Sequence, residues 1–553
     1  MMMLRNCAVA LLVSAGLLTP ASDAELADFR VRPYVQNPAS DAITLIWFTD
    51  AATPGRVVVS GPEGSRTLAS APKPAEALRY HPVELKKLPG GRDPGPPHKH
   101  RVRITGLQPR QTYHYTVTQG GSTFAAQFRT APAADVPVRF IVYADCETEP
   151  ESTGSARAWR RPFDDRDRRY IADQTTGYAE NLKVIASRRP DFICIAGDIV
   201  ETGGEQRDWD EFWRHNAGAY NDVAARIPIL PALGNHDNYG GPNELGGFGV
   251  AASRRAIEKY RTYFELPDNQ IANAGHRGRY YRLDYGPVTL ITLDSSNGLP
   301  HRSSRDTNVY MVGEGESDEQ GHAGIAPDFN PGSPQYTWLI EQLADAQRKS
   351  RFTFVQFHHA PYSVGPHSFP PGSAGQKNGE DTQSGVPMRV LTPSFMRYGV
   401  DAVLCGHDEI YEHSLLEGDE RLPDGHSVGH TIHFYDVGIG GDGLRGPSRG
   451  PDGTFRPDSR NEHQVFLAHL NAPEKWEGKR LIDGGRHYGH LEVNVRADDD
   501  GGWQATLTPV YIFPLMDRAG NLTGWERRTY ADEITLRAAR RSGAALSAAS
   551  RSE

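Results

Sequence analysis

The stretch DFICIAGDIVE, residues 191–201, decides the fold. Its first half is a continuous apolar run, typical of a strand buried on both faces of a sheet, and the run ends in Gly197 and Asp198. Comparable apolar runs occur at 138–145, 227–237, 288–296, 352–361 and 401–409. They alternate with helical stretches such as 179–189 and 335–349. Apolar strands that alternate with helices predict an α/β domain with layered sheets.

Polar residues follow these runs where each predicted strand ends. Every run except 288–296 closes on Asp, Asn, His or Glu. Sites in open α/β sheets lie beyond the carboxyl ends of the strands, so we expect these side chains to converge. A single His or Asp at a strand end is usually a cap or turn residue, but several in one chain predict a common site. The candidates are Asp145, Asp198, Asn235, His236, His359 and His407.

Residues 29–131 follow a different pattern, in which apolar and polar residues alternate. Short alternating runs separated by Gly, Pro and Asp turns predict an antiparallel β-sandwich of about one hundred residues. The predicted fold class is therefore an all-β sandwich followed by an α/β domain. We place the sandwich at residues 25–134 and the α/β domain at 135–530. Small and polar residues at 531–553 predict a disordered tail.

Three long loops are expected inside the α/β domain. Stretches rich in Gly, Pro and His occur at 297–334, 363–386 and 414–470. Loops of this length in a compact domain are usually lids, binding loops or disordered segments. They favour a restricted pocket.

Residues 1–24 predict a secretory signal peptide. An arginine precedes an apolar stretch, and Ser22 and Ala24 are small residues at the positions that precede a cleavage site. The apolar run is shorter than the roughly 20 residues that span a bilayer, so a membrane anchor is the weaker alternative. We expect no membrane span after cleavage. The predicted location is periplasmic or extracellular.

The composition narrows the class of protein further. The 553-residue chain has a formal net charge of −9 and a pI near 6.2. This acidic balance argues against binding to a nucleic-acid duplex, which needs a basic face. Beyond the signal, Cys146, Cys194 and Cys405 lie in or beside apolar runs, which predicts buried reduced thiols. Nothing in the composition indicates an oligomeric state.

The order of the polar motifs resembles that of calcineurin-like metallophosphoesterases. The stretches RVRPYVQNPASDAITLIWFTD (30–50) and VRITGLQPRQTYHYTV (102–117) resemble the fibronectin-type-III-like domain of purple acid phosphatases, one branch of that superfamily. The resemblance implies a catalytic domain of two mixed sheets flanked by helices. It also implies two divalent or trivalent metal ions bridged by Asp198.

The same resemblance implies a ligand set for each ion. One ion would take Asp198, Asn235, His359 and His407. His359 is chosen over its neighbour His358 because His359-Ala360-Pro361 satisfies the H-x-P spacing of the family. The second ion would take Asp145 and Asp198, with Glu147 and Glu409 as further ligands.

This sequence departs from the family pattern around the second ion. Glu201 stands where purple acid phosphatases have tyrosine, Glu147 where the wider superfamily has the histidine of D-x-H, and Glu409 where the family has the second histidine of G-H-x-H. Oxygen ligands favour Mg²⁺, Mn²⁺, Ca²⁺ or Fe³⁺, and mixed oxygen and imidazole ligands suit Zn²⁺, Fe²⁺ or Mn²⁺. The alternatives are that the second ion is lost, or that Glu201 is simply solvated.

The expected activity follows from this resemblance. It implies an exported binuclear phosphoesterase that hydrolyses small phosphate mono- or diesters by attack of a metal-bridged hydroxide. His236 would face the phosphoryl group as a general acid, and His367 would contact the phosphate. Asp237 would orient His236 or cap a turn. The alternative function is a secreted binding or adhesion protein with a structural or vestigial metal site.

Overall fold

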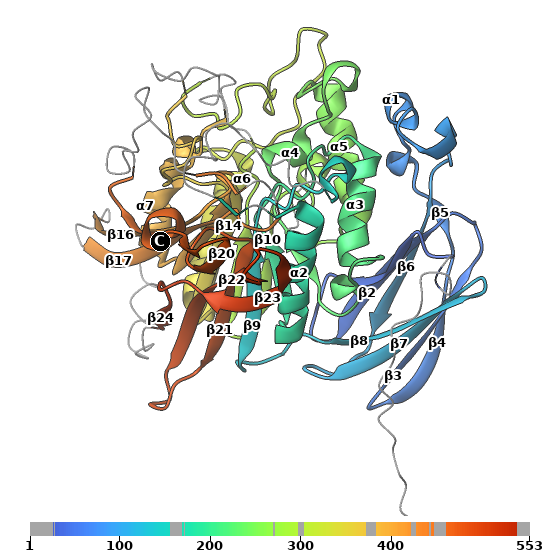
Figure 1. Cartoon of the computed structure of the whole chain (residues 1–553), viewed down its shortest axis with the longest axis horizontal. Helices are drawn as coiled ribbons and strands as arrows, with labels where there is room; N and C mark the ends of the chain where they lie inside the picture. Colours follow the sequence, from blue (N-terminus) through green and yellow to red (C-terminus); the bar gives the residue numbers. More distant parts are fainter. Residues whose placement is uncertain are drawn as a thin grey trace, which may run out of the picture.

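The computed structural model resolves two regions of different architecture, a β-rich region in blue and a larger α/β region from green to red (Figure 1). The structure describes residues 26, 28–154, 169–170, 172–268, 271, 273–296, 303–371, 383–421, 427–441, 444–446 and 461–538. The predicted signal peptide at 1–24 and the end of the predicted tail at 539–553 lie outside the described residues.

The N-terminal region is a sandwich of two four-stranded antiparallel sheets, ordered β1-β2-β6-β5 and β4-β3-β7-β8. Side chains of β7 and β8 alternate between buried and more exposed positions, as the sequence pattern predicted. The elements are β1 (Val31–Gln36), β2 (Ala42–Thr49), β3 (Gly55–Gly61), β4 (Gly64–Ser70), β5 (Lys73–Pro74), α1 (Pro82–Leu85), β6 (His98–Thr105), β7 (Thr112–Gln119) and β8 (Ser122–Arg129).

The α/β region contains two seven-stranded sheets. The first has the order β11-β10-β9-β21-β22-β23, with β24 also pairing with β22. Strands β9, β10 and β11 are parallel, and β21 is antiparallel to β9. Its strands are β9 (Val138–Tyr143), β10 (Phe192–Ile195), β11 (Ile229–Pro231), β21 (Gly489–Ala497), β22 (Trp503–Met516), β23 (Leu522–Thr529) and β24 (Ile534–Arg537).

The second sheet has the order β12-β13-β14-β15-β17-β16-β18. Strands β13, β14, β15 and β17 are parallel to their neighbours in this series. Its strands are β12 (Tyr281–Tyr285), β13 (Val288–Thr292), β14 (Phe352–His359), β15 (Ala402–Gly406), β16 (Tyr411–Arg421), β17 (Ser427–Val437) and β18 (Gln464–Leu467). A separate hairpin joins β19 (Lys475–Glu477) and β20 (Arg480–Asp483).

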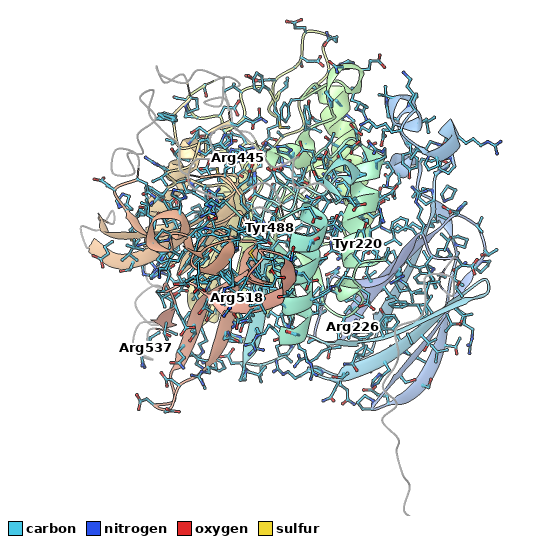
Figure 2. The ribbon with its side chains drawn as sticks, viewed as in Figure 1. Tyr220, Arg226, Arg445, Tyr488, Arg518 and Arg537 are labelled. Atoms are coloured by element: carbon cyan, nitrogen blue, oxygen red, sulfur yellow. The ribbon has the colours of Figure 1, made fainter. Side chains whose placement is uncertain are left out.

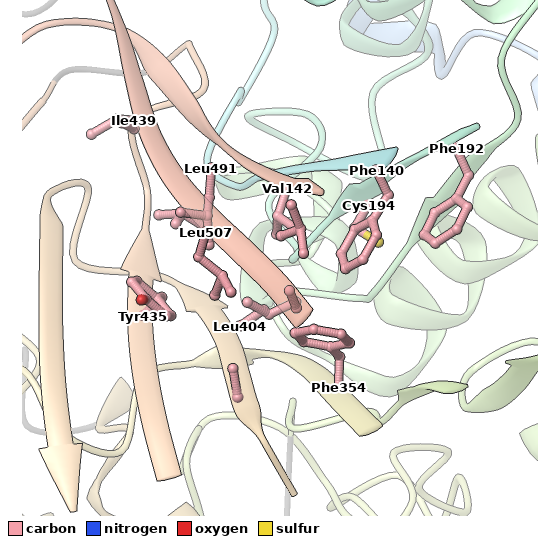
Figure 3. Close-up of a cluster of buried hydrophobic side chains, with 14 of the residues drawn as sticks. Phe140, Val142, Phe192, Cys194, Phe354, Leu404, Tyr435, Ile439, Leu491 and Leu507 are labelled. Atoms are coloured by element: carbon pink, nitrogen blue, oxygen red, sulfur yellow. The ribbon is translucent and has the colours of Figure 1, made fainter. Parts of the chain in front are cut away.

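The two large sheets pack face to face, and helices cover their outer faces. Figure 3 shows side chains of both sheets in one apolar cluster, and the rings of Phe140 and Phe354 meet edge to face with centroids 5.2 Å apart. Residues of α2 and α3 pack on the first sheet, and residues of α6 and α7 on the second. The helices are α2 (Gln174–Arg188), α3 (Gln206–Asn216), α4 (Asn235–Asn238), α5 (Val250–Tyr263), α6 (Pro334–Lys349), α7 (Thr392–Tyr398) and α8 (Ala468–Asn471). The predicted fold class is confirmed.

Hydrogen bonds fix the sandwich to the α/β region. The hydroxyl of Tyr34 donates to the carbonyl of Tyr263 at 2.8 Å, and that of Tyr115 donates to the carbonyl of Ala225 at 2.8 Å. Both tyrosines are buried, so these bonds join the two regions through a dry contact.

Two sequence predictions about irregular segments are wrong in part. The loop predicted at 414–470 contains most of β16 and all of β17 and β18, and the tail predicted from residue 531 contains β24. The Gly, Pro and His content of 414–470 favoured a loop, and the small and polar residues of 531–553 favoured a tail, but β24 has four residues paired with β22. Cys146, Cys194 and Cys405 are buried free thiols, as predicted. Across the described segments, every helix is too short or too polar to cross a membrane.

Candidate metal centre

The candidate residues lie where five parallel strands end. Strands β9, β10 and β11 of the first sheet lead into the segments that carry Asp145, Asp198 and Asn235. Strands β14 and β15 of the second sheet lead into the two adjacent histidines and His407. The facing sheets therefore bring together residues that are far apart in the sequence.

One half of the centre, the imidazole side, consists of Asp198, Asn235, His358 and His407. The Nε2 atom of His358 lies 2.8 Å from Asp198 Oδ2, 3.0 Å from Asn235 Oδ1 and 3.1 Å from His407 Nδ1. When a tetrahedral ion binds its ligands at roughly 2.0–2.1 Å, the ligand atoms lie only slightly farther apart than these donor atoms do. Two imidazoles, a carboxylate and an amide oxygen are also a donor set that suits Zn²⁺, Fe²⁺ or Mn²⁺. These residues fit a metal ion.

Hydrogen bonds behind the imidazole side orient its donors. The Nδ1–H of His358 donates to the carbonyl of Ala196 at 3.0 Å, which leaves Nε2 facing the centre. Nε2 of His407 contacts the carbonyl of Gln383, and the Asn235 amide donates to Gln383 Oε1 at 3.1 Å. Such outer partners fix the tautomer and the ring orientation of metal ligands. Sequence reasoning missed Gln383, which follows no strand.

The choice of His359 as a ligand stays a prediction, because both histidines of β14 border the centre: the ring centroid of His359 lies 4.4 Å from that of His407, and that of His358 lies 4.8 Å from it. The pairing of β14 is irregular between Gln356 and His359, and Nε2 of His358 lies 2.8 Å from Asp198 Oδ2. His359 Nδ1 lies 2.9 Å from Ser295 Oγ, and its Nε2 has no hydrogen-bond partner among the described residues. Burial lowers the pKa of His359, so its ring stays neutral. The H-x-P spacing favours His359, whereas the group of converging donor atoms includes His358.

The other half, the carboxylate side, consists of Asp145, Glu147 and Glu409. Oxygens of Asp145, Glu147 and Asp198 lie within 4.8 Å of one another. Burial raises the pKa of Asp145 well above its usual value, and the charges of Asp198, Asp436 and Glu409 raise it further. Burial also acts to raise the pKa of Asp198, but His358, His236 and hydrogen bonds outweigh it and hold that pKa below its usual value. A cation is the group that would relieve the repulsion on this side.

Glu409 has a neighbour that the sequence did not predict. Its Oε1 lies 2.6 Å from Nη2 of Arg445, and both side chains are buried. Glu409 is not a member of the converging donor groups found among the described residues. The prediction that Glu409 is a metal ligand therefore competes with an ion pair to Arg445. Arg445 follows a glycine-rich run. No periodic pattern of apolar residues around it indicated that it would lie at the centre.

His236 lies between the centre and solvent. Its backbone N–H donates to Asp198 Oδ1 at 2.9 Å, and its Nδ1–H donates to the carbonyl of Glu201 at 2.7 Å. Its Nε2 lies 3.7 Å from Glu147 Oε1, and its side chain is 23% exposed. Asp237 accepts from the N–H groups of Ile199 and Gly234, so it caps the turn and does not orient the imidazole. A partly exposed imidazole with one nitrogen fixed can serve a substrate with the other.

The remaining candidates, His367 and Glu201, also border the centre. The ring of His367 lies on that of His407, with centroids 4.0 Å apart, and its Nε2 lies 3.2 Å from Nη1 of Arg445. Glu201 offers a carboxylate oxygen within 4.8 Å of donors of Glu147 and His236. The structure therefore places both predicted residues beside the centre, where a substrate or an ion would meet them.

Backbone strain is concentrated at this centre. Ten non-glycine residues of the described chain have positive φ. Half of them are site candidates: Asp145, Glu147, Asp198, His407 and Glu409. Left-handed backbone is unfavourable for such residues and persists where the surroundings impose it, often at functional sites. Gly234 is required for a different, steric reason, because a Cβ there would lie 2.1 Å from Asp198 Oδ1.

Sequence comparisons identify both regions. Residues 139–411 match the family described as calcineurin-like phosphoesterase, and residues 29–130 match the purple acid phosphatase N-terminal domain. The protein Rv2577 of Mycobacterium tuberculosis is 28% identical over 74% of this chain and 72% of its own length. Tartrate-resistant acid phosphatase type 5 of Rattus norvegicus is 24% identical over 55% of this chain and 73% of its own length.

Solved structures agree with this fold. The purple acid phosphatase PPD1 of yellow lupin aligns with 90% of this chain and 73% of its own, with a TM-score of 0.52 and 16% identity. The structure of PhoD aligns with 92% of this chain and 90% of its own, with a TM-score of 0.55 and 15% identity. Together with the site geometry, the two family matches show that this chain belongs to the calcineurin-like metallophosphoesterases that carry an N-terminal domain of the purple acid phosphatase type.

Proposed function

We propose that this chain is a metal-dependent hydrolase of small phosphate mono- or diesters that holds two metal ions. The observation that carries the proposal is the approach of one donor atom each of Asp198, Asn235 and His407 to within about 3 Å of His358 Nε2. Such ions, when bound, lower the pKa of water and withdraw charge from phosphoryl oxygens. The carboxylates of Asp145 and Glu147 would hold the second ion beside Asp198.

The chain's own residues supply the other parts of the reaction. Asn235 contributes a neutral oxygen, so Asp198 carries the negative charge of the imidazole side. A divalent or trivalent cation bound there would keep a net positive charge and would attract an anionic substrate. His236 keeps Nδ1 on the carbonyl of Glu201, so Nε2 is the atom that would donate a proton to the leaving oxygen. We further propose export to the periplasm or the exterior, which rests on the residue pattern of 1–24.

Hydrolysis of two chromogenic esters tests this function. The chain would be stripped with a chelator, reloaded separately with Mn²⁺, Zn²⁺, Fe²⁺, Mg²⁺ or Ca²⁺, and assayed with p-nitrophenyl phosphate and bis(p-nitrophenyl) phosphate. We expect metal-dependent hydrolysis that Asn235→Ala abolishes and Asn521→Ala, a change in an exposed turn, preserves. Absence of hydrolysis with every ion, or equal rates in both variants, would contradict the proposal.

A further inference from the structure

The sandwich region reaches into the α/β region through Glu84 of α1. The side chain of Glu84 is buried, and Figure 1 shows α1, in blue, on the side of the molecule where α3 and α5 lie. Its Oε1 accepts from the backbone N–H groups of Gln206 at 2.6 Å and Arg207 at 3.1 Å, and its Oε2 accepts from that of His81 at 2.6 Å. One carboxylate of the sandwich region therefore joins α1 to the start of α3.

Glu84 supplies a cap that α3 does not provide for itself. Glu205 is the N-cap residue of α3, and its side chain makes no capping hydrogen bond. The first N–H groups of a helix have no partner within the helix, and a carboxylate stabilises this positive end. Gln206 and Arg207 are the first two residues of α3, so Glu84 satisfies their N–H groups from a distant part of the chain.

Lys259 of α5 makes a second contact at the same junction. Its side chain is buried, and its Nζ donates to the carbonyl of Arg79 at 3.0 Å and to Gln206 Oε1 at 3.1 Å. Arg79 precedes α1, and Gln206 begins α3. The segment around α1 is therefore fixed to the start of α3 by two buried polar side chains.

The turn before α3 contacts the loop that carries His236. The N–H of Gly203 donates to the carbonyl of His236 at 2.9 Å, and the N–H of Gly204 donates to the carbonyl of Tyr239 at 2.9 Å. The indole N–H of Trp209, in α3, donates to the carbonyl of Gly203 at 2.8 Å. Hydrogen bonds therefore run from α3 through this turn to the loop of His236.

The same turn contains the group that orients the imidazole of His236. Nδ1–H of His236 donates to the carbonyl of Glu201 at 2.7 Å, which leaves Nε2 for a substrate. Glu201 lies only five residues before Gln206, whose N–H is held by Glu84. Displacement of a catalytic group by about 1 Å can lower a rate about 100-fold. The position of the start of α3 therefore affects the position of the proton donor.

We infer that Glu84 is a positioning residue for His236, so that the sandwich region takes part in the reaction of the α/β region. By holding the start of α3, Glu84 keeps the carbonyl of Glu201 on the imidazole and Nε2 directed toward the leaving oxygen. The inference rests on the proposed function and adds a role for the sandwich region. Glu84 itself touches neither the substrate nor a metal ligand.

Two esters with different leaving groups test this role. p-Nitrophenolate is a weak base and leaves with little help from a proton donor, whereas phenolate is more basic and depends on one. Glu84→Gln keeps the shape of the side chain but replaces one acceptor oxygen with a donor amide. Metal-loaded wild type and variants would be assayed for kcat/KM on p-nitrophenyl phosphate and phenyl phosphate, with metal content measured by mass spectrometry.

Two control variants separate this role from a general loss of stability. Glu76→Gln removes a carboxylate from the same segment, but its side chain is 65% exposed. Tyr115→Phe removes the buried hydrogen bond to the carbonyl of Ala225, at another point of the contact between the two regions. Figure 2 shows the neighbouring Arg226 at the lower end of this contact, whereas α1 lies at the upper end in the same view.

We expect Glu84→Gln to lower kcat/KM roughly 5- to 20-fold on phenyl phosphate and less than about 3-fold on p-nitrophenyl phosphate, because only the first ester depends on the proton donor. Metal content should stay at the wild-type level. In a His236→Ala background, Glu84→Gln should cause no further loss on phenyl phosphate, since the two residues act as one unit. Both controls should match wild type on both esters.

Hydrogen exchange measured by mass spectrometry tests the same link without turnover. In the metal-free protein, Glu84→Gln should speed amide exchange at 203–207 and at 234–240 roughly 10-fold, because both segments lose a fixed neighbour. Neither control should change exchange in these segments.

Three results would overturn the inference: equal fractional losses on the two esters, the same loss in the His236→Ala background, or unchanged exchange at 234–240. If Glu84→Gln does not fold, Glu84→Asp provides the same comparison, because it keeps both oxygens on a side chain that is too short to reach α3. Failure of the wild type to hydrolyse any ester would contradict the proposed function instead, and hydrogen exchange would still decide whether Glu84 holds the loop of His236.

Discussion

The imidazole side and the carboxylate side of the centre are built differently. On the imidazole side, donor atoms approach within 2.8 to 3.1 Å of His358 Nε2, and carbonyl groups hold the rings from behind. On the carboxylate side, Asp145 and Glu147 have positive φ and gather beside Asp198, and burial together with like charges raises the pKa of Asp145. The first side is organised by hydrogen bonds, whereas the second concentrates negative charge.

This difference indicates how each side would respond to a cation. Oriented imidazoles bind an ion without rearrangement, so the imidazole side should retain its ion tightly. Buried carboxylates repel one another until a cation or a proton balances them, so binding at the carboxylate side should depend more strongly on pH. Arg445 already balances one of these carboxylates, Glu409.

Asp198→Asn should have the largest effect because Asp198 contributes to both sides. Its Oδ2 meets His358 Nε2, and its oxygens lie within 4.8 Å of those of Asp145 and Glu147. We expect loss of both ions and of ester hydrolysis, measured by mass spectrometry and by the p-nitrophenyl phosphate assay. Two tightly bound ions in this variant would show that Asp198 does not join the two sides.

His236→Ala should have the next largest effect, on turnover, and it should leave the metal ions of both sides bound. We expect metal content near wild type and a decrease in turnover of roughly 10²- to 10⁴-fold, as for loss of a general acid. Parallel measurement of metal content and kcat checks this. If metal is lost instead, His236 is a ligand through Nε2, which lies 3.7 Å from Glu147 Oε1.

Glu492→Gln should have the smallest effect. It tests how a buried carboxylate behaves when arginine side chains balance its charge at a position outside the centre. Glu492 is a buried carboxylate whose two oxygens each lie 2.8 Å from the guanidinium of Arg188. Burial acts to raise its pKa, but the bonds to Arg188 and Asn494 and nearby arginine charges lower it from 4.5 to about 2. Here protein cations balance a buried carboxylate, as a metal ion would at the carboxylate side.

The pH dependence of this variant follows from the direction of that shift. A lowered pKa stabilises the fold fully above pH 4.5, and the stabilisation is lost as pH falls toward 2. We expect Glu492→Gln to lower the free energy of unfolding by about 1 to 3 kcal/mol at pH 7. Denaturant unfolding at pH 7 and pH 3 should show a smaller difference at pH 3, with hydrolysis at pH 7 unchanged. A difference that grows as pH falls would contradict this account.

The sequence predicted the parts of this molecule that depend on local pattern. Apolar runs that end in polar residues identified Asp145, Asp198, Asn235 and His407, because the carboxyl ends of parallel strands meet at one edge. The alternation at 29–131 identified the sandwich.

The remaining features depend on tertiary contacts. Which of His358 and His359 would bind an ion depends on the tertiary contacts at the irregular end of β14, and no spacing within the strand encodes it. Arg445 and Gln383 reach the centre from segments without apolar periodicity. β24 has only four residues within a segment of small and polar residues, and its pairing with β22 supplies the hydrogen bonds that its composition does not predict.

The most direct test of the central claim is the metal content of His358→Ala beside His359→Ala after dialysis against a weak chelator. Both changes remove one buried imidazole from the same strand, so they match in size and position. We predict that His358→Ala loses the ion of the imidazole side, whereas His359→Ala keeps the wild-type content. Loss of metal in His359→Ala with retention in His358→Ala, or a wild type that binds no metal, would contradict the account.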